Sequence, residues 1–124
     1  MMDSIYNGPM NKFEKALEEI KKDYPVRQIT KTYAQIEFQI LFDSYNFIFI
    51  GILFENDDVL LTDFAEYAQI CPWEDKDIPD LEKICQKHHL VFKNYHIECP
   101  YRSNQDIKNF LDTILELRKK YVNF

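Results

Sequence analysis

Two cysteines and two histidines in the second half of the chain have the side chains that a structural zinc site requires. Cys85 and His88 form a C-x2-H pair, and His96 and Cys99 form an H-x2-C pair. Thiolate and imidazole are the usual zinc ligands, and four of them complete a tetrahedral site. Cys85 and His88 share one face of an expected helix, but His96 and Cys99 would point to opposite faces of a strand. The alternative is that Cys85 is a small buried hydrophobe of the helix stripe.

Acidic side chains near the strand expected at residues 34–42 indicate a second possible chemistry, metal-dependent cleavage of nucleic acid. Nucleases of the restriction-enzyme type hold Mg²⁺ against a phosphate with an acid on one strand and E-x-K or E-x-Q on the next. Glu37 and Gln39 form E-x-Q on a polar strand face, Asp43 follows that strand, and Asp63 ends a later one. An E-x-Q on a solvated face also arises by chance, and no positively charged groove accompanies it. We expect no cofactor, with zinc and Mg²⁺ as the alternatives.

Asp63 lies in the stretch LLTDFAEYAQ, where an apolar run stops and a helix-like segment begins. Its side chain can accept hydrogen bonds from the first amides of the helix, and Glu66 stands where a capping box needs it. This interpretation predicts a structural role of about 1 kcal/mol and a small cost for Asp63→Asn, because Asn caps nearly as well. The functional alternative is a cation site shared with Asp57 or Asp58, which lie at the far end of one short strand.

Other catalytic patterns have little support, whereas aromatic residues are abundant. The chain has two glycines, no glycine-rich phosphate loop and no G-x-S-x-G motif. It has ten phenylalanines and eight tyrosines. Tyr67, Trp73, Tyr95 and Tyr101 fall near loops or element ends, where aromatic side chains anchor protein interfaces or close the edge of a core.

An α+β fold is expected to position these residues. The stretch AQIEFQILF alternates between apolar and polar residues, as a strand with one buried face does. The stretch YNFIFIGILF is apolar on both faces, which is typical of a strand that is covered on both sides. We predict an antiparallel meander sheet of three to five strands, packed with helices that include a long C-terminal one. The predicted helices are at 10–24, 63–70, 78–88 and 103–122, and the predicted strands are at 26–32, 34–42, 45–54 and 59–62. Residues 90–99 are expected to form a small hairpin or two short extended pieces.

Composition and charge limit the classes of function. The chain of 124 residues is 46% hydrophobic and carries a net charge of -6, so one domain with a real core is expected. The negative charge argues against a broad nucleic-acid surface, because phosphate binding needs clustered Lys and Arg. With three cysteines, no visible signal peptide and no run long enough to span a bilayer, we expect a cytoplasmic protein with free thiols.

The chain resembles the bacterial and phage family called domain of unknown function 1828, over roughly residues 34–121. The similar features are LLTD at 60–63, LEKICQKHHLVFKNYHIE at 81–98 and DIKNFLDTILELRKK at 106–120. Members often carry a glycine soon after the aspartate, where this chain has Phe64-Ala65. The resemblance implies a compact α+β domain from genomes rich in prophage and mobile elements, and it implies no catalytic residues.

We therefore expect a tail at residues 1–9 and a single domain at residues 10–124. The expected function is a non-enzymatic protein-interaction domain of bacterial or phage origin that binds another protein or a second copy of itself. The long last helix and the edge of the meander are the expected docking surfaces. The alternative is a metal-dependent nuclease-like enzyme that uses the acids of the sheet face.

Overall fold

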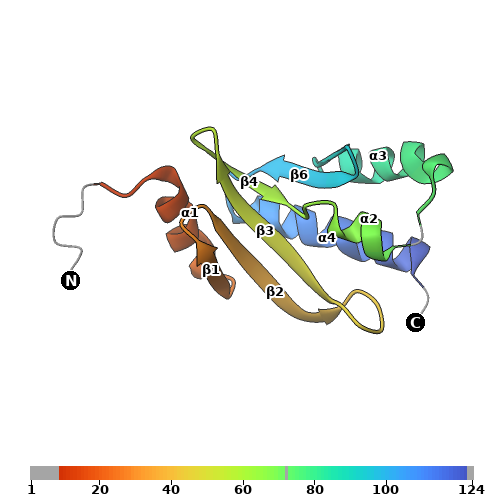
Figure 1. Ribbon diagram of the computed structural model, residues 1–124, viewed down its shortest axis with the longest axis horizontal. Helices are drawn as coiled ribbons and strands as arrows, with labels where there is room; N and C mark the ends of the chain where they lie inside the picture. The colour runs from red at the N-terminus through yellow and green to blue at the C-terminus, as the bar shows by residue number, and fades with distance from the viewer. Residues whose placement is uncertain (1–8, 72, 123–124) are drawn as a thin grey trace.

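The computed structural model describes residues 9–71 and 73–122, and within them an antiparallel sheet packs with helices (Figure 1). The sheet has six strands in the order β1-β2-β3-β4-β6-β5. The elements are α1 (Lys12–Lys21), β1 (Val26–Thr30), β2 (Tyr33–Leu41), β3 (Phe47–Glu55), β4 (Asp58–Thr62), α2 (Glu66–Ile70), the 3-10 helix η1 (Asp75–Asp77), α3 (Ile78–Lys87), β5 (Val91–Lys93), β6 (His96–Pro100) and α4 (Asn104–Tyr121). Among these described elements, no helix is both long and apolar enough to cross a membrane.

The predicted α+β class is confirmed, and the sheet is larger than the three to five strands expected. The hairpin predicted at residues 90–99 forms β5 and β6 and joins the meander, because β6 pairs with β4. In this pairing Leu61 lies opposite Cys99. The tail predicted at residues 1–9 lies outside the described residues, except for Pro9.

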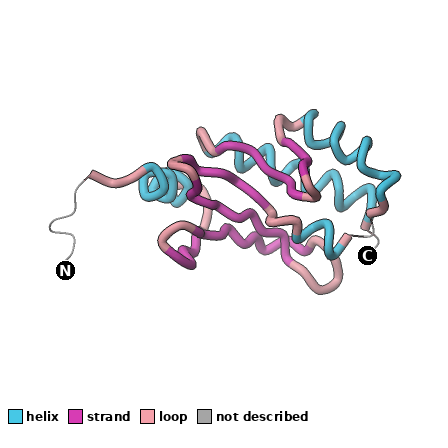
Figure 2. The backbone as a smooth tube through the Cα atoms, turned by 45° about the horizontal axis from the view of Figure 1, so that its top comes forward, coloured by secondary structure: helices cyan, strands magenta, loops and turns pink. Residues whose placement is uncertain are grey.

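One face of the sheet is packed under helices. Alternate side chains of β2, β3, β4 and β6 are fully buried on this core face: Ala34, Ile36, Ile48, Ile50, Ile52, Leu61 and Ile97. Helix α1 contacts β1 and β4, and α4 contacts β3 and α3. Figure 2 shows α3 and α4 side by side along one part of the molecule and α1 at the other end. Each fully buried Ile, Leu or Phe side chain stabilises the fold by about 1.5–3 kcal/mol.

Side-chain caps fix the starts of the two helices that pack on the sheet. Asn11 accepts a hydrogen bond from the Glu14 amide, and the Glu14 carboxylate accepts one from the Asn11 amide. Ser103 and Asp106 form the same capping box at the start of α4, which confirms the box predicted there. Such a cap is worth about 1 kcal/mol.

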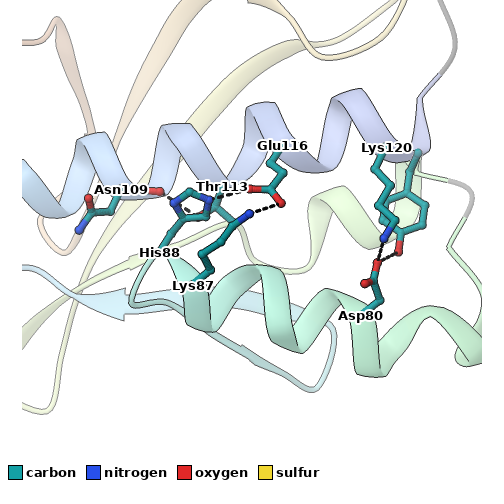
Figure 3. A network of polar contacts seen from close by, with 8 residues as sticks. Asp80, Lys87, His88, Asn109, Thr113, Glu116 and Lys120 are labelled. Carbon is teal, nitrogen blue, oxygen red and sulfur yellow. Dashed lines mark hydrogen bonds and ion pairs between the residues drawn. The ribbon is translucent and has the colours of Figure 1, made fainter.

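Helix α4 is less available as a docking surface than its sequence suggested. Its residues Ile107, Phe110, Ile114 and Leu117 are fully buried, and another side of the helix faces α3 across a polar network (Figure 3). Packing on two sides leaves only part of the α4 surface for a partner.

Gly51 in β3 allows the two strands on either side to approach closely. A β-carbon built at this position would lie 2.8 Å from the Thr62 carbonyl oxygen and 3.0 Å from the Tyr33 hydroxyl oxygen. The Tyr33 ring therefore covers the position that a side chain would fill. Such contacts between an aromatic ring and a strand glycine stabilise sheets.

We predict that Gly51→Ala destabilises the protein by about 1–3 kcal/mol, the usual cost of overpacking. The Thr62 oxygen belongs to the backbone of β4 and has little freedom to move away. Urea denaturation would measure the change, with Glu55→Ala at the exposed end of the same strand as the control. Wild-type stability in the Gly51→Ala protein would contradict the packing described here.

Candidate functional site

The four candidate zinc ligands are not grouped together in the structure. Cys85 and Cys99 are buried on the core side, whereas His96 lies on the other face of β6, as the alternation of a strand requires. His96 has its Nδ1 atom 2.9 Å from the Asn94 carbonyl oxygen. Among the described residues, no three His, Cys, Asp or Glu side chains are grouped to hold a metal ion.

His88 belongs to the polar network between α3 and α4 (Figure 3). Its Nε2 atom lies 2.8 Å from one Glu116 carboxylate oxygen, and the Lys87 ammonium lies 2.7 Å from the other. Further along the same helix pair, Asp80 contacts Lys120 and Tyr121. Hydrogen bonds from Lys87 and His88 lower the pKa of Glu116. These contacts connect α3 to α4, and they give His88 a structural role.

The three cysteines are free and buried. Burial raises the pKa of each thiol, at Cys71, Cys85 and Cys99, to about 12. Because the thiolate is the nucleophilic form, none of the three is poised for attack at neutral pH.

The four residues of the nuclease hypothesis lie in different surroundings. Glu37 and Gln39 are exposed on β2. Asp43 closes the β2–β3 turn, where its carboxylate accepts hydrogen bonds from the amides of Tyr45 and Asn46 at 2.8 and 2.7 Å. Asp63 is fully buried. The structure explains Asp43 by hydrogen bonds within its turn and Asp63 by hydrogen bonds that include one to the distant Ile97.

Asp63 joins three segments of the chain. Its Oδ1 atom accepts hydrogen bonds from the amides of Ala65 at 3.0 Å and Ile97 at 2.8 Å, and its Oδ2 atom accepts one from the Tyr67 amide at 3.2 Å. In addition, the Asp63 amide donates to the Ile97 carbonyl at 3.2 Å. We call this arrangement the Asp63 junction. It connects the end of β4 to the start of α2 and to β6.

This geometry differs from the predicted capping box. Helix α2 begins at Glu66 after Ala65, and the Glu66 side chain does not complete a box. Phe64 and Ala65 both have positive φ values, 51° and 61°, a conformation that glycine adopts more readily. The expectation of a harmless Asp63→Asn substitution is also revised. An Asn side chain has one oxygen, so its NH2 group would face one of the three buried amides.

Burial raises the pKa of Asp63 to about 6, although the three amide hydrogen bonds and the charge of His96 oppose this effect. A carboxyl whose pKa is higher in the folded protein stabilises the fold most when it is protonated. Its contribution is therefore complete below the unfolded pKa, near 4, and is lost as the pH rises through about 6.

We predict that wild-type protein loses stability relative to Asp63→Asn as the pH rises from 4 to 7. The change in the difference over this range is about 2 kcal/mol, because each pKa unit is worth 1.36 kcal/mol and the unfolded carboxyl is already partly ionised at pH 4. Urea denaturation of both proteins at several pH values would measure it, and other titrating groups cancel in the comparison. A difference that is constant over this range would show that Asp63 does not titrate as described.

Tyr67 takes the place of a strand partner for β3. Strand β4 ends at Thr62, which pairs with Gly51, so Phe49 lies beyond the reach of β4. The fully buried Tyr67 hydroxyl donates to the Phe49 carbonyl at 2.9 Å and accepts from the Phe49 amide at 3.0 Å. Its ring also stacks on Phe49, with centroids 5.4 Å apart. Tyr67 is therefore part of the core, and it fixes α2 against β3.

We predict that Tyr67→Phe lowers the free energy of unfolding by about 1–3 kcal/mol, because a buried amide and carbonyl lose their partner. Tyr45→Phe is the matched control, since its ring is 91% exposed and loses nothing buried. Thermal or urea denaturation of both variants would separate the two effects. Equal stability of the two variants would argue that Tyr67 does not hold Phe49.

An aromatic groove lies on the side of the sheet opposite to the core face. Its volume is about 420 Å³. Strands β2 and β3, the turn between them and the α2 segment supply its lining: Tyr33, Gln35, Glu37, Tyr45, Asn46, Phe47, Phe49, Phe64, Glu66 and Ile70. Among these, Tyr45, Phe47 and Phe64 are 91%, 45% and 40% exposed. We refer to this set of residues as the aromatic groove.

The aromatic groove depends on the Asp63 junction for one of its walls. Phe64, Glu66 and Ile70 come from α2 and the turn before it, and Asp63 and Tyr67 hold that segment in place. The opposite wall is the polar face of β2, where Tyr33, Gln35 and Glu37 alternate with buried residues. The Tyr33 and Phe64 rings meet edge to face at 5.1 Å.

The four aromatic residues that the sequence suggested as interface anchors are not the exposed rings of the groove. Of the four candidates, Tyr67 is buried, Trp73 packs between Phe92 and Tyr121, and Tyr95 and Tyr101 bond to Asp75 and Asn104. The exposed rings of the groove were missed. Their positions did carry a signal, because an aromatic residue in a turn, as at Tyr45, or directly after a strand end, as at Phe64, has little core to enter.

A larger cleft of about 790 Å³ lies between α1, the β3–β4 turn and the segment that connects β6 to α4. Its charged lining residues have both signs: Lys12, Lys15, Arg102, Glu19, Glu55 and Asp58. Lys12 is already paired with Asp58 at 3.5 Å and lies 3.8 Å from Asp57. The mixed charge selects no particular ligand, so the aromatic groove is the stronger candidate site.

Comparison of the chain with protein-family models, with curated proteins and with solved structures found no match.

Proposed function

We propose that this protein is a small non-enzymatic interaction domain that docks a basic segment of a partner protein in its aromatic groove. The observation that carries the proposal is the clustering of Tyr45, Phe47 and Phe64, three exposed aromatic rings, around one groove. Exposed apolar clusters with polar rims are typical of protein-binding surfaces, and aromatic residues are enriched among the residues that contribute most to binding.

The charge of the groove supports a basic partner. Glu37 and Glu66 are its ionisable carboxylates, and no Lys, Arg or His is part of its lining. The whole chain also has a net charge of -6, which would attract a basic segment and speed its association.

Two further parts of the proposal rest on other observations. A cytoplasmic location is supported by the three free thiols, since disulfides are rare in that compartment. A bacterial or phage origin rests on the resemblance to the domain of unknown function 1828 family. The nuclease alternative gains no support from the placement of Glu37, Gln39, Asp43 and Asp63.

We predict that the double variant Tyr45→Ser/Phe47→Ser loses its partner while remaining folded, because both rings are largely exposed. Affinity capture from the source cells would compare it with wild type and with the control Ile29→Ser/Val91→Ser. The control removes exposed apolar residues from the two edge strands. The captured partner would then be purified and its complex reconstituted with each form.

A partner that binds wild type and control but not the groove variant supports docking in the groove. A partner lost only from the control would place docking at the sheet edges instead. Equal binding to all three forms would also contradict the proposal. Circular dichroism of each variant would verify that it is folded.

A further inference from the structure

We propose that the aromatic groove holds an arginine side chain of the partner, with the guanidinium between the rings of the groove and the carboxylates of Glu37 and Glu66. This inference rests on the proposed function and names the group that the groove recognises. It follows from the two carboxylates that line the groove, from the rings that line it with them and from one carbonyl oxygen that no hydrogen bond uses.

The two carboxylates stand on different elements that border the same groove. Glu37 projects from β2 and Glu66 from α2. In the described part of the chain, neither side chain has a hydrogen bond or an ion pair, whereas many other acids of the surface do, such as Asp80 and Glu116. Both carboxylates are therefore available to a cation that enters from outside.

The rings that line the same groove suit a flat cation. Tyr33, Phe49 and Phe64 contribute to the lining, and the first and last of these meet edge to face. Burial raises the pKa of Tyr33, the hydrogen bond from Gln35 opposes this, and the negative charge of Glu66 raises it further. The charge of Glu66 is thus near enough to act on the Tyr33 hydroxyl. A cation over such rings gains both the attraction of the ring face and that of the carboxylate.

The hydrogen-bonding groups favour arginine over lysine. Gln35 lines the groove and donates from its Nε2 atom to the Tyr33 hydroxyl at 2.7 Å, which leaves its side-chain carbonyl oxygen as an acceptor. A guanidinium is planar, stacks on aromatic rings and offers five donors in a fixed fork, whereas an ammonium is a compact and strongly hydrated charge. One arginine can therefore satisfy acceptors on both walls.

Arg27 is a nearby positive charge of the chain itself that would oppose the binding of a partner arginine. It lies opposite Gln35 in the β1–β2 pair and lines a neighbouring small cleft with Glu37. It forms no ion pair with Glu37 in the structure, so Glu37 is open to a partner. Removing the Arg27 charge would strengthen the local negative potential and favour an incoming arginine.

NMR titration of the labelled full chain would test this inference with two short peptides. The probe is acetyl-Gly-Leu-Arg-Leu-Gly-amide, and its control carries citrulline, a neutral isostere, in place of arginine. We expect the arginine peptide to shift the resonances of Gln35, Phe49 and Phe64 and the citrulline peptide to shift them far less. Glu37→Gln and Glu66→Gln should each weaken binding about two- to fivefold. Arg27→Gln should strengthen it, and Glu18→Gln on the exposed side of α1 should leave it unchanged.

The outcomes separate this inference from the proposed function. Equal shifts from both peptides would overturn arginine recognition and leave the groove as an apolar docking site. Shifts from neither peptide, or shifts outside the groove, would also overturn it. In each of these cases the partner-capture comparison decides the proposed function by itself, because it uses the natural partner and the apolar groove variant.

Discussion

The buried carboxylate of Asp63 is the interaction on which the arrangement of the α2 segment depends. It accepts hydrogen bonds from amides of Ala65, Tyr67 and Ile97, and the last of these is 34 residues away in sequence. A helix as short as the five residues of α2 does not form by itself in water. The carboxylate and the Tyr67 hydroxyl supply what the short helix lacks, and they attach it to β6 and β3. Two residues with positive φ, Phe64 and Ala65, form the tight turn that this attachment requires.

The same attachment shapes the surface of the protein. Because α2 is held beside β3, Phe64, Glu66 and Ile70 face the polar side of β2 across a groove. The other face of the sheet is occupied by the core that α1 and α4 cover. The protein thus uses one face of its sheet for folding and leaves part of the other face available. Glu37 and Phe47 lie on that second face, and the other exposed rings and the Glu66 carboxylate lie in the turn and the α2 segment beside it.

Local patterns in the sequence predicted most of the elements but not their long-range contacts. The alternation of AQIEFQILF and the helical stripe that ends the chain depend on neighbouring residues, and β2 and α4 formed as expected. What the sequence did not predict is that the hairpin joins the meander, because its two strands of three and five residues reach the sheet only through the pairing of β6 with β4. The Ile97 bond of Asp63 depends on the same pairing, so the sequence showed a helix cap where the structure has a junction of three segments. The C-x2-H and H-x2-C pattern could not show how its residues are placed, because the period of two in β6 puts His96 and Cys99 on opposite faces of the strand. The aromatic groove could not be predicted, since its two walls meet only after the turn at Phe64 and Ala65 has formed.

Hydrogen exchange of individual amides tests the role of the Asp63 junction most directly. The amide protons of Ala65, Tyr67 and Ile97 are bonded to one buried carboxylate, so they should be protected from exchange and should open together. Their opening free energies should approach those of the central strand β3. Exchange of Ala65 and Tyr67 at the rate of an open loop, with only Ile97 protected, would contradict the account. In that case α2 would not be fixed to the sheet, and the groove would lack its second wall.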